Sequence, residues 1–266
     1  MVSQLHVVSV HVKDHESFNS LFLFFRDTLK LPLLYGELTR PENAGKTMYA
    51  GFSAGNCYFE PCGPYAFDAA FPLNQSARFH GLTFSPTKSA PEIATALDLQ
   101  GFDHSDIIPP SSSGEDDDTA RLIYLKDARF VGKWLAVSIW EIRDKKDPVN
   151  HPFLRSSLSA AKGGALGLKW VKEVRVGYAA RNSRDRWTTF LTPATQEGEL
   201  CHIGDGPAIR FVQAQENCVE SVVLKVESLR AARTFLADNG LLGKDAGRNI
   251  ELDERKARGL RIVLEE

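Results

Sequence analysis

Residues 219–236, VESVVLKVESLRAARTFL, hold a strand pattern and a helix pattern in one short stretch. The first part, Ser221 to Val226, is a mostly apolar run of strand length. After Glu227, apolar residues recur at helical spacing, namely at Leu229, Ala232, Phe235 and Leu236. Gly240 follows where a glycine commonly ends a helix. This stretch therefore predicts a strand followed directly by a helix.

The same order of strand, polar break and helix occurs three more times along the chain. These patterns cover residues 5–29, 79–99 and 173–191. Further strand-like runs follow each helix, and the third unit, with a single such run at 208–213, is the least complete. One unit of this kind leaves a whole sheet face exposed, whereas two units together can cover that face and close a cavity. The repeats therefore predict four similar units that work in pairs.

Two irregular stretches separate the repeats. Residues 64–77 are rich in Pro, Phe and Ala, and residues 143–164 carry charges, Pro148, Pro152 and a Gly-Gly pair. The second stretch is the better domain boundary. We therefore expect an N-terminal domain at 1–145, with modules at 4–63 and 78–143, and a C-terminal domain at 165–266, with modules at 166–215 and 217–266.

Composition and charge narrow the classes of function. The 266 residues are 43% hydrophobic and 25% charged, as in a globular protein, and the net charge is −2. Nucleic acid is not expected as a partner, because there is no basic surplus for a phosphate backbone. No signal peptide and no apolar run of about 18 residues is present, so we expect no membrane partner. The four cysteines suit free thiols, and the prediction is a cytoplasmic protein.

Several short motifs resemble those of the vicinal oxygen chelate superfamily, which includes glyoxalases, extradiol dioxygenases and bleomycin-resistance proteins. HVVSVHVKD at 6–14 and FHGLTFSP at 79–86 resemble its opening strands. YAGFSAGNCYFEP at 49–61 and LAVSIWEIRD at 135–144 resemble its closing strands, which end in a glutamate. The second half also resembles bacterial glyoxalase-like proteins of unassigned activity. The resemblance implies an α+β fold of four βαβββ modules that form two glyoxalase-like domains, with curved mixed sheets enclosing a cavity.

The resemblance also implies a divalent metal site in the first domain. The four ligand positions of the superfamily match Val7, Glu60, His80 and Glu141. Valine cannot bind a metal, so His80, Glu141 and Glu60 are the expected ligands. Imidazole and carboxylate donors suit zinc, nickel, manganese or iron. Glu141 and Glu60 are also the candidate catalytic residues, because a glutamate released from the metal can act as a general base.

Strand alternation indicates which side chains face the cavity. If Val8, Val10 and Val12 pack on the helix, then Ser9 and His11 face the cavity and His6 faces the helix. Ser9, His11 and Tyr58, which shares a face with Glu60, are therefore the expected substrate contacts.

The alternation of the second opening strand leaves two readings of its histidine open. His80 shares a face with Leu82 and Phe84, so it is a core histidine if that face packs on the helix. It is a ligand if the face with Thr83 and Ser85 packs there instead. Glu60 and Glu141 also have an alternative reading, as glutamates at the rim of the strand ends.

In the second domain, the positions that match the ligands hold Ser221 and Glu173, and no histidine joins Glu265, so that domain reads as metal-free. The leading hypothesis is an enzyme that acts on a small oxygenated organic molecule by isomerase, lyase or oxygenase chemistry. The alternative is a metal-independent protein that binds or sequesters a small molecule, which the valine at position 7 favours. A purely structural role is the third. A monomer or a homodimer fits either of the first two hypotheses.

Overall fold

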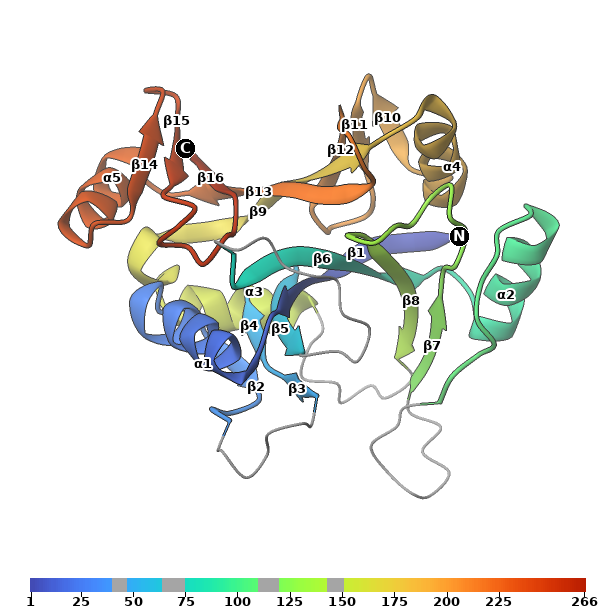
Figure 1. Ribbon diagram of the computed structural model, residues 1–266, viewed down its shortest axis with the longest axis horizontal. Helices are drawn as coiled ribbons and strands as arrows, with labels where there is room; N and C mark the ends of the chain where they lie inside the picture. The colour runs from blue at the N-terminus through green and yellow to red at the C-terminus, as the bar shows by residue number, and fades with distance from the viewer. Residues whose placement is uncertain (40–46, 64–74, 110–119, 143–150) are drawn as a thin grey trace.

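The computed structural model describes residues 1–39, 47–63, 75–109, 120–142 and 151–266, without the side chain of residue 151. Within these ranges the chain forms two eight-stranded mixed sheets with few helices (Figure 1). The first sheet is built from residues 2–142 and the second from residues 168–265. This arrangement confirms the predicted α+β fold of two glyoxalase-like halves.

The first sheet joins two modules through their opening strands. Its order is β2-β4-β5-β1-β6-β8-β7, with β3 paired to β5. The central strands β1 and β6 are antiparallel, and each has a parallel partner, β5 for β1 and β8 for β6. The strands are β1 (Val2–Val12), β2 (Leu33–Tyr35), β3 (Met48–Tyr49), β4 (Gly51–Ser53), β5 (Tyr58–Gly63), β6 (Ala77–Pro86), β7 (Ala120–Tyr124) and β8 (Ala136–Ile142).

The second sheet repeats this plan. Its order is β10-β11-β12-β9-β13-β16-β15-β14, with β9 and β13 antiparallel at the centre and parallel partners β12 and β16 outside them. The third module, which shows one strand pattern after its helix in the sequence, has three strands there. The strands are β9 (Leu168–Tyr178), β10 (Thr195–Glu197), β11 (Leu200–His202), β12 (Ala208–Gln213), β13 (Cys218–Val226), β14 (Leu242–Asp245), β15 (Asn249–Leu252) and β16 (Ile262–Glu265).

Each opening strand leads into a helix: α1 (His15–Leu23, continued by the π-helical turn η1, Phe24–Thr28), α2 (Ala90–Leu99), α4 (Arg181–Leu191) and α5 (Leu229–Asp238). Local side chains explain where three of these helices begin. The Asp14 carboxylate accepts a hydrogen bond from the Ser17 amide, and the Ser228 hydroxyl accepts one from the Ala231 amide. Ser89 and Glu92 form a capping box at α2.

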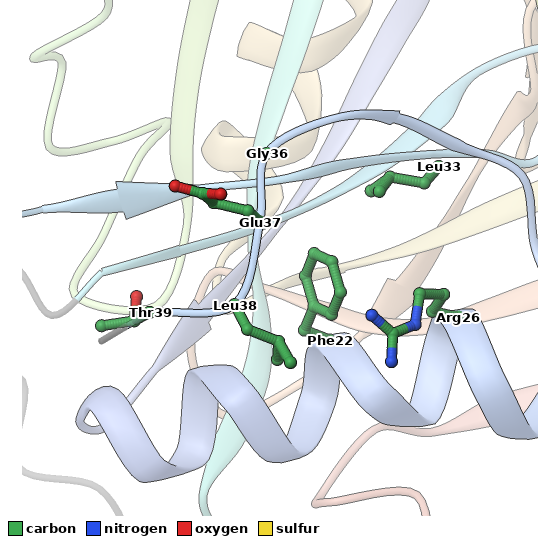
Figure 2. A pocket seen from close by; sticks show the side chains of 7 residues that line it. All are labelled: Phe22, Arg26, Leu33, Gly36, Glu37, Leu38 and Thr39. Atoms are coloured by element: carbon green, nitrogen blue, oxygen red, sulfur yellow. The ribbon is translucent and has the colours of Figure 1, made fainter. Parts of the chain in front are cut away.

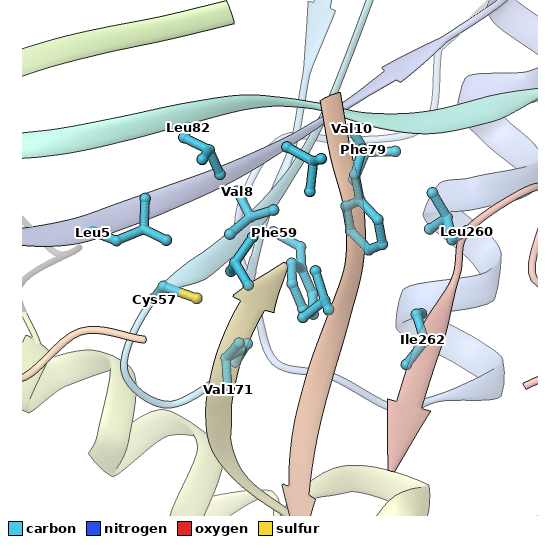
Figure 3. Packing of buried hydrophobic residues seen from close by; sticks show 14 of the residues in the cluster. Leu5, Val8, Val10, Cys57, Phe59, Phe79, Leu82, Val171, Leu260 and Ile262 are labelled. Carbon is cyan, nitrogen blue, oxygen red and sulfur yellow. The ribbon is translucent and has the colours of Figure 1, made fainter. Parts of the chain in front are cut away.

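The two sheets pack against each other through one continuous apolar core. Val8, Phe59 and Leu82 of the first sheet belong to the same buried cluster as Val171 and Ile262 of the second (Figure 3). Figure 1 shows β1 and β6 lying against β9 and β13, with the remaining strands bending away on either side. We call the core side of each sheet its outer face and the opposite side its inner face. The inner faces therefore point away from each other.

A further helix, α3 (His151–Ala160), lies in the stretch that the sequence indicates as a linker. Leu154 of α3 is fully buried against Val7 and Tyr58 of the first sheet. Its carbonyl accepts a hydrogen bond of 2.7 Å from the Ser53 hydroxyl. The linker therefore covers part of the inner face of the first sheet; residues 143–150, before it, lie outside the described ranges.

The four cysteines are buried free thiols, as predicted. In the described part of the chain, no helix combines the length and the apolar character that crossing a membrane requires.

Candidate functional site

The inner face of the first sheet gathers most of the predicted site residues. Strands β1 and β5 run parallel, with Val7 beside Tyr58, Ser9 beside Glu60 and His11 beside Cys62. The residues between them, among them Val8, Val10 and Phe59, belong to the core, as alternation predicts. Ser9, His11 and Glu60 thus follow one another along two adjacent strands.

Glu60 is held by hydroxyl groups. The Tyr35 hydroxyl donates to Oε1 at 2.6 Å, and the Ser9 hydroxyl donates to Oε2 at 3.3 Å. No ion pair to Glu60 is present among the described residues. Burial raises the pKa of the Glu60 carboxyl, and the two hydrogen bonds oppose that rise. The result is a carboxyl group that gains a proton more readily than an exposed glutamate.

His80 lies beside His11, with 5.4 Å between the ring centroids. The register of β1 and β6 shifts between the Ser9–Gly81 pair and the Val10–Phe79 pair, so His80 is an extra residue in a bulge. This bulge takes His80 out of strict alternation with Leu82 and Phe84. Burial, with smaller effects of His11 and Arg78, lowers the pKa of His80 to about 4. Its Nδ1 atom is buried with no hydrogen-bond partner in the described structure.

A second bulge corrects the prediction for His6. The register shifts between Leu5 and Val7, and the His6 ring meets the Tyr58 ring edge-on at 5.3 Å and the Trp140 ring at 6.4 Å. His6 therefore contacts the aromatic side chains of the inner face and does not face the helix. Tyr58, an expected substrate contact, is itself fully buried. It forms part of the floor of this face.

Glu141 is placed differently from Glu60. It alternates with Val137 and Ile139, which belong to the core, so it lies on the outer face of β8. Its Oε2 atom accepts a hydrogen bond of 3.0 Å from the Ala90 amide at the start of α2. A carboxylate at this end of a helix stabilises the helix dipole. Glu141 thus has a structural partner that the sequence pattern does not reveal.

The structure therefore does not bring His80, Glu141 and Glu60 together as a ligand set. No group of three His, Cys, Asp or Glu side chains among the described residues is arranged to hold a metal ion. The fourth matched position, Val7, packs on Tyr58 and Leu154. The donors on the inner face of the first sheet do not fit a three-ligand divalent centre.

Sequence reasoning missed two features of this face. Tyr35 reaches Glu60 because β2, β4 and β5 lie side by side, a pairing that spans 25 positions of sequence. The hydroxyl groups of Thr83 and Ser138, on paired strands, lie 2.8 Å apart. A tyrosine in a strand-like run was the only signal for the first of these contacts.

The positions that match the ligands in the second domain hold an ion-pair group. The Glu173 carboxylate, 3% exposed, accepts from Arg175 Nε at 2.9 Å and from Arg210 Nε at 2.8 Å. Glu265 pairs with Lys172. These carboxylates are already bound by cationic side chains.

A shallow pocket of about 340 Å³ lies between α1 and residues 33–39 (Figure 2). Phe22 and Arg26 of the helix point towards this segment, and Leu38 reaches down to the helix. Arg26 is paired with Asp27 and lies over the Phe22 ring. The pocket holds none of the predicted site residues, so it is separate from the Glu60 site.

Comparison with known proteins yields structural matches only. No protein-family model and no curated protein matches the sequence. The structure is similar to a 2,3-dioxygenase from Pseudomonas (TM-score 0.60, 12% identity, 99% of this chain and 92% of that chain covered). It is also similar to a Mn(II)-bound glyoxalase from Novosphingobium aromaticivorans (0.58, 10%, 99% and 81%). A mutant 4-hydroxymandelate synthase from Streptomyces coelicolor matches likewise (0.62, 13%, 99% and 92%). The chain therefore has the fold of the vicinal oxygen chelate superfamily, in agreement with the resemblance of its motifs.

Proposed function

We propose that the inner face of the first sheet binds a small oxygenated organic molecule without a three-ligand metal centre. The observation that carries this proposal is the Glu60 carboxyl, which has hydroxyl partners and no cationic one among the described residues. Burying a carboxyl group without a cationic partner is costly, and groups perturbed in this way concentrate at functional sites. Of the three hypotheses from the sequence, this geometry favours the metal-independent binding protein.

The surroundings of Glu60 suit a ligand with an apolar body and at least one hydroxyl or carbonyl group. A protonated Glu60 can donate to a carbonyl oxygen, and an ionised one can accept from a hydroxyl. Tyr49 and Tyr124 are 48% and 44% exposed. Burial, and after it the negative charges of Tyr49, Glu60 and Cys62, raise the pKa of Tyr124. Exposed tyrosines beside a polar anchor are typical of small-molecule sites.

A second candidate function uses the same site for proton transfer. The raised pKa of Glu60 brings this carboxyl closer to the range in which a general acid or base works at neutral pH. The imidazole of His11, on the same sheet face, is a further group of the kind that exchanges protons, and the neutral imidazole of His80 lies beside it. Isomerase or lyase chemistry on a carbonyl compound moves a proton, and Glu60 is the group that we propose for this step.

The test compares Glu60→Gln with Glu141→Gln in thermal shift and calorimetric binding against a panel of small phenols, hydroxy acids and aldehydes. Glu60→Gln keeps the shape of the side chain but removes its proton chemistry, and Glu141→Gln changes a carboxylate on the other face. We expect a ligand that raises the melting temperature of the wild type and of Glu141→Gln but not that of Glu60→Gln. Turnover of the same ligand by wild type alone would select the proton-transfer candidate.

Elemental analysis of protein purified without chelator or affinity-tag metal tests the proposed absence of a metal centre. We expect no stoichiometric metal in the wild type. The proposal would be overturned if the wild type held one equivalent of zinc, nickel, manganese or iron and both His80→Ala and Glu141→Ala lost it. That result would support the hypothesis of a metal-dependent enzyme.

A further inference from the structure

A pocket of about 510 Å³ lies on the inner face of the second sheet, at its border with the first domain. Three arginines from separate segments line it: Arg78 of β6, Arg175 of β9 and Arg261, which directly precedes β16. Ser221, which stands opposite Arg175 across β9 and β13, lines it as well. The pocket is therefore formed by both domains and is separate from the Glu60 site.

Each of the three guanidinium groups has one ion-pair partner and N–H groups to spare. Arg78 Nη2 lies 3.3 Å from Glu216, and Arg175 Nε lies 2.9 Å from Glu173. Arg261 pairs with Glu220 through Nη1. A guanidinium carries five N–H donors, so each of these ion pairs leaves donors for a ligand. Arg78 also lies over the Trp134 ring, 4.3 Å from its centroid, and contacts Cys218, which holds its guanidinium in place at the pocket. None of the three pairs is bidentate.

The balance of charge around the pocket is positive. Among the described residues, its lining includes the three arginines and two carboxylates, Glu216 and Glu220. The third partner, Glu173, is shared between Arg175 and Arg210. The Glu216 and Glu220 side chains are 48% and 34% exposed, and ion pairs of this exposure contribute little to stability. An incoming anion can therefore replace either glutamate as the partner of its arginine at small cost.

From this convergence we infer that the pocket is a binding site for a small organic acid or a phosphate ester. Guanidinium groups bind carboxylate and phosphate oxygens through paired N–H donors, which fixes both affinity and orientation. The volume suits a molecule of metabolite size. Because Arg78 belongs to the first domain and the other two arginines to the second, a bound anion joins the two domains.

The experiment measures binding of inorganic phosphate and of succinate by calorimetry at constant ionic strength, with chloride as the reference anion. We expect Arg78→Gln and Arg261→Gln each to weaken binding about tenfold, the loss of one charge-assisted contact. Arg233→Gln is the matched control, since Arg233 forms an Arg–Asp pair with Asp245 outside the pocket. The Glu60→Gln variant should bind as wild type does, which separates this site from the proposed function.

Preference for phosphate over succinate, or the reverse, assigns the natural ligand to phosphate esters or to organic acids. Two results would overturn the inference. One is that neither anion binds more tightly than chloride. The other is that Arg78→Gln and Arg261→Gln bind either anion as tightly as Arg233→Gln does, which would leave the arginines as surface ion pairs only.

Discussion

The two sheets share one topology, yet the carboxylates on their inner faces have opposite surroundings. Glu60 receives hydrogen bonds from two neutral hydroxyl groups, those of Ser9 and Tyr35. Glu173 receives them from two guanidinium groups, those of Arg175 and Arg210. Opposite charges stabilise an ionised carboxylate, whereas hydroxyl groups in a buried site compensate only part of the lost hydration. The carboxylate on the inner face of the second sheet therefore has cationic partners, whereas the one on the inner face of the first sheet has neutral partners.

This difference indicates a division of labour between the domains. A carboxylate bound by two arginines stabilises the charged side chains around it and has little freedom to react. A carboxyl with a raised pKa is costly to maintain, and such groups concentrate at functional sites. In our two proposals, the first domain thus supplies the carboxyl group that binds the small molecule, and the second supplies guanidinium donors for an anion.

Replacing each carboxylate by its amide is the most direct way to break the comparison. Glu173→Gln leaves two guanidinium groups without their counter-charge on an inner face, so we expect a loss of about 3 kcal/mol in the free energy of unfolding. Arg175 and Arg210 are 29% and 38% exposed, which places the loss at the low end for such pairs. Glu60→Gln should cost less than about 1 kcal/mol, because its partners are neutral. Urea unfolding at pH 7 measures both, and equal losses would contradict the comparison.

The fold follows from local patterns that the sequence displays openly. The alternation of Val8, Val10 and Val12 and the helical spacing of Leu229, Ala232 and Leu236 both place these residues in the core, where they lie. Asp14 and Ser228, close to the boundary between strand and helix patterns, cap α1 and α5. These signals depend on neighbours within a few positions, so a single sequence is enough to reveal them.

The site was less predictable because alternation shows that two faces differ but not which of them is the inner one. Glu141 alternates with Val137 and Ile139, and only the packed structure shows that this face meets α2. The bulges at His6 and His80 shift the register by one residue, and no local pattern signals them. Tyr35 reaches Glu60 through the pairing of distant strands, which a single sequence does not reveal.

The inner face of the first sheet also holds His80, whose lowered pKa makes the stability of the protein depend on pH. The folded pKa of about 4 lies below the unfolded value of 6.5, so between these values the unfolded chain binds more protons. Stability from the neutral imidazole is thus complete above pH 6.5 and is lost as the pH falls towards 4. We expect wild type to lose about 2 kcal/mol more than His80→Asn over this range, measured by urea unfolding.

The His202→Asn variant is the control for this measurement, since it replaces an exposed imidazole outside the first sheet. A His80→Asn variant whose stability falls with pH as steeply as that of the wild type would show that the imidazole is not held neutral. Titration of Glu60 opposes that of His80, because a raised carboxyl pKa stabilises the fold at low pH. The titration of Glu60 is common to His80→Asn and His202→Asn, so the difference between these two variants does not contain it.

The smallest expected effect comes from one hydroxyl group. In the wild type, the 2.6 Å hydrogen bond from Tyr35 lowers the pKa of the Glu60 carboxyl. Tyr35→Phe removes this bond, so the pKa of Glu60 should rise further in the variant. A single bond of this kind contributes about 1 kcal/mol. Because the folded pKa of Glu60 is raised, its contribution to stability is present below the unfolded value of 4.5 and is lost as the pH rises. The loss of stability in Tyr35→Phe should therefore be greater at pH 7 than at pH 4.

Carboxyl NMR titration measures the pKa of Glu60 directly. Tyr124→Phe is the control, since it removes another tyrosine hydroxyl of the same domain. An unchanged pKa of Glu60 in Tyr35→Phe would refute the claim that hydroxyl groups tune this carboxyl.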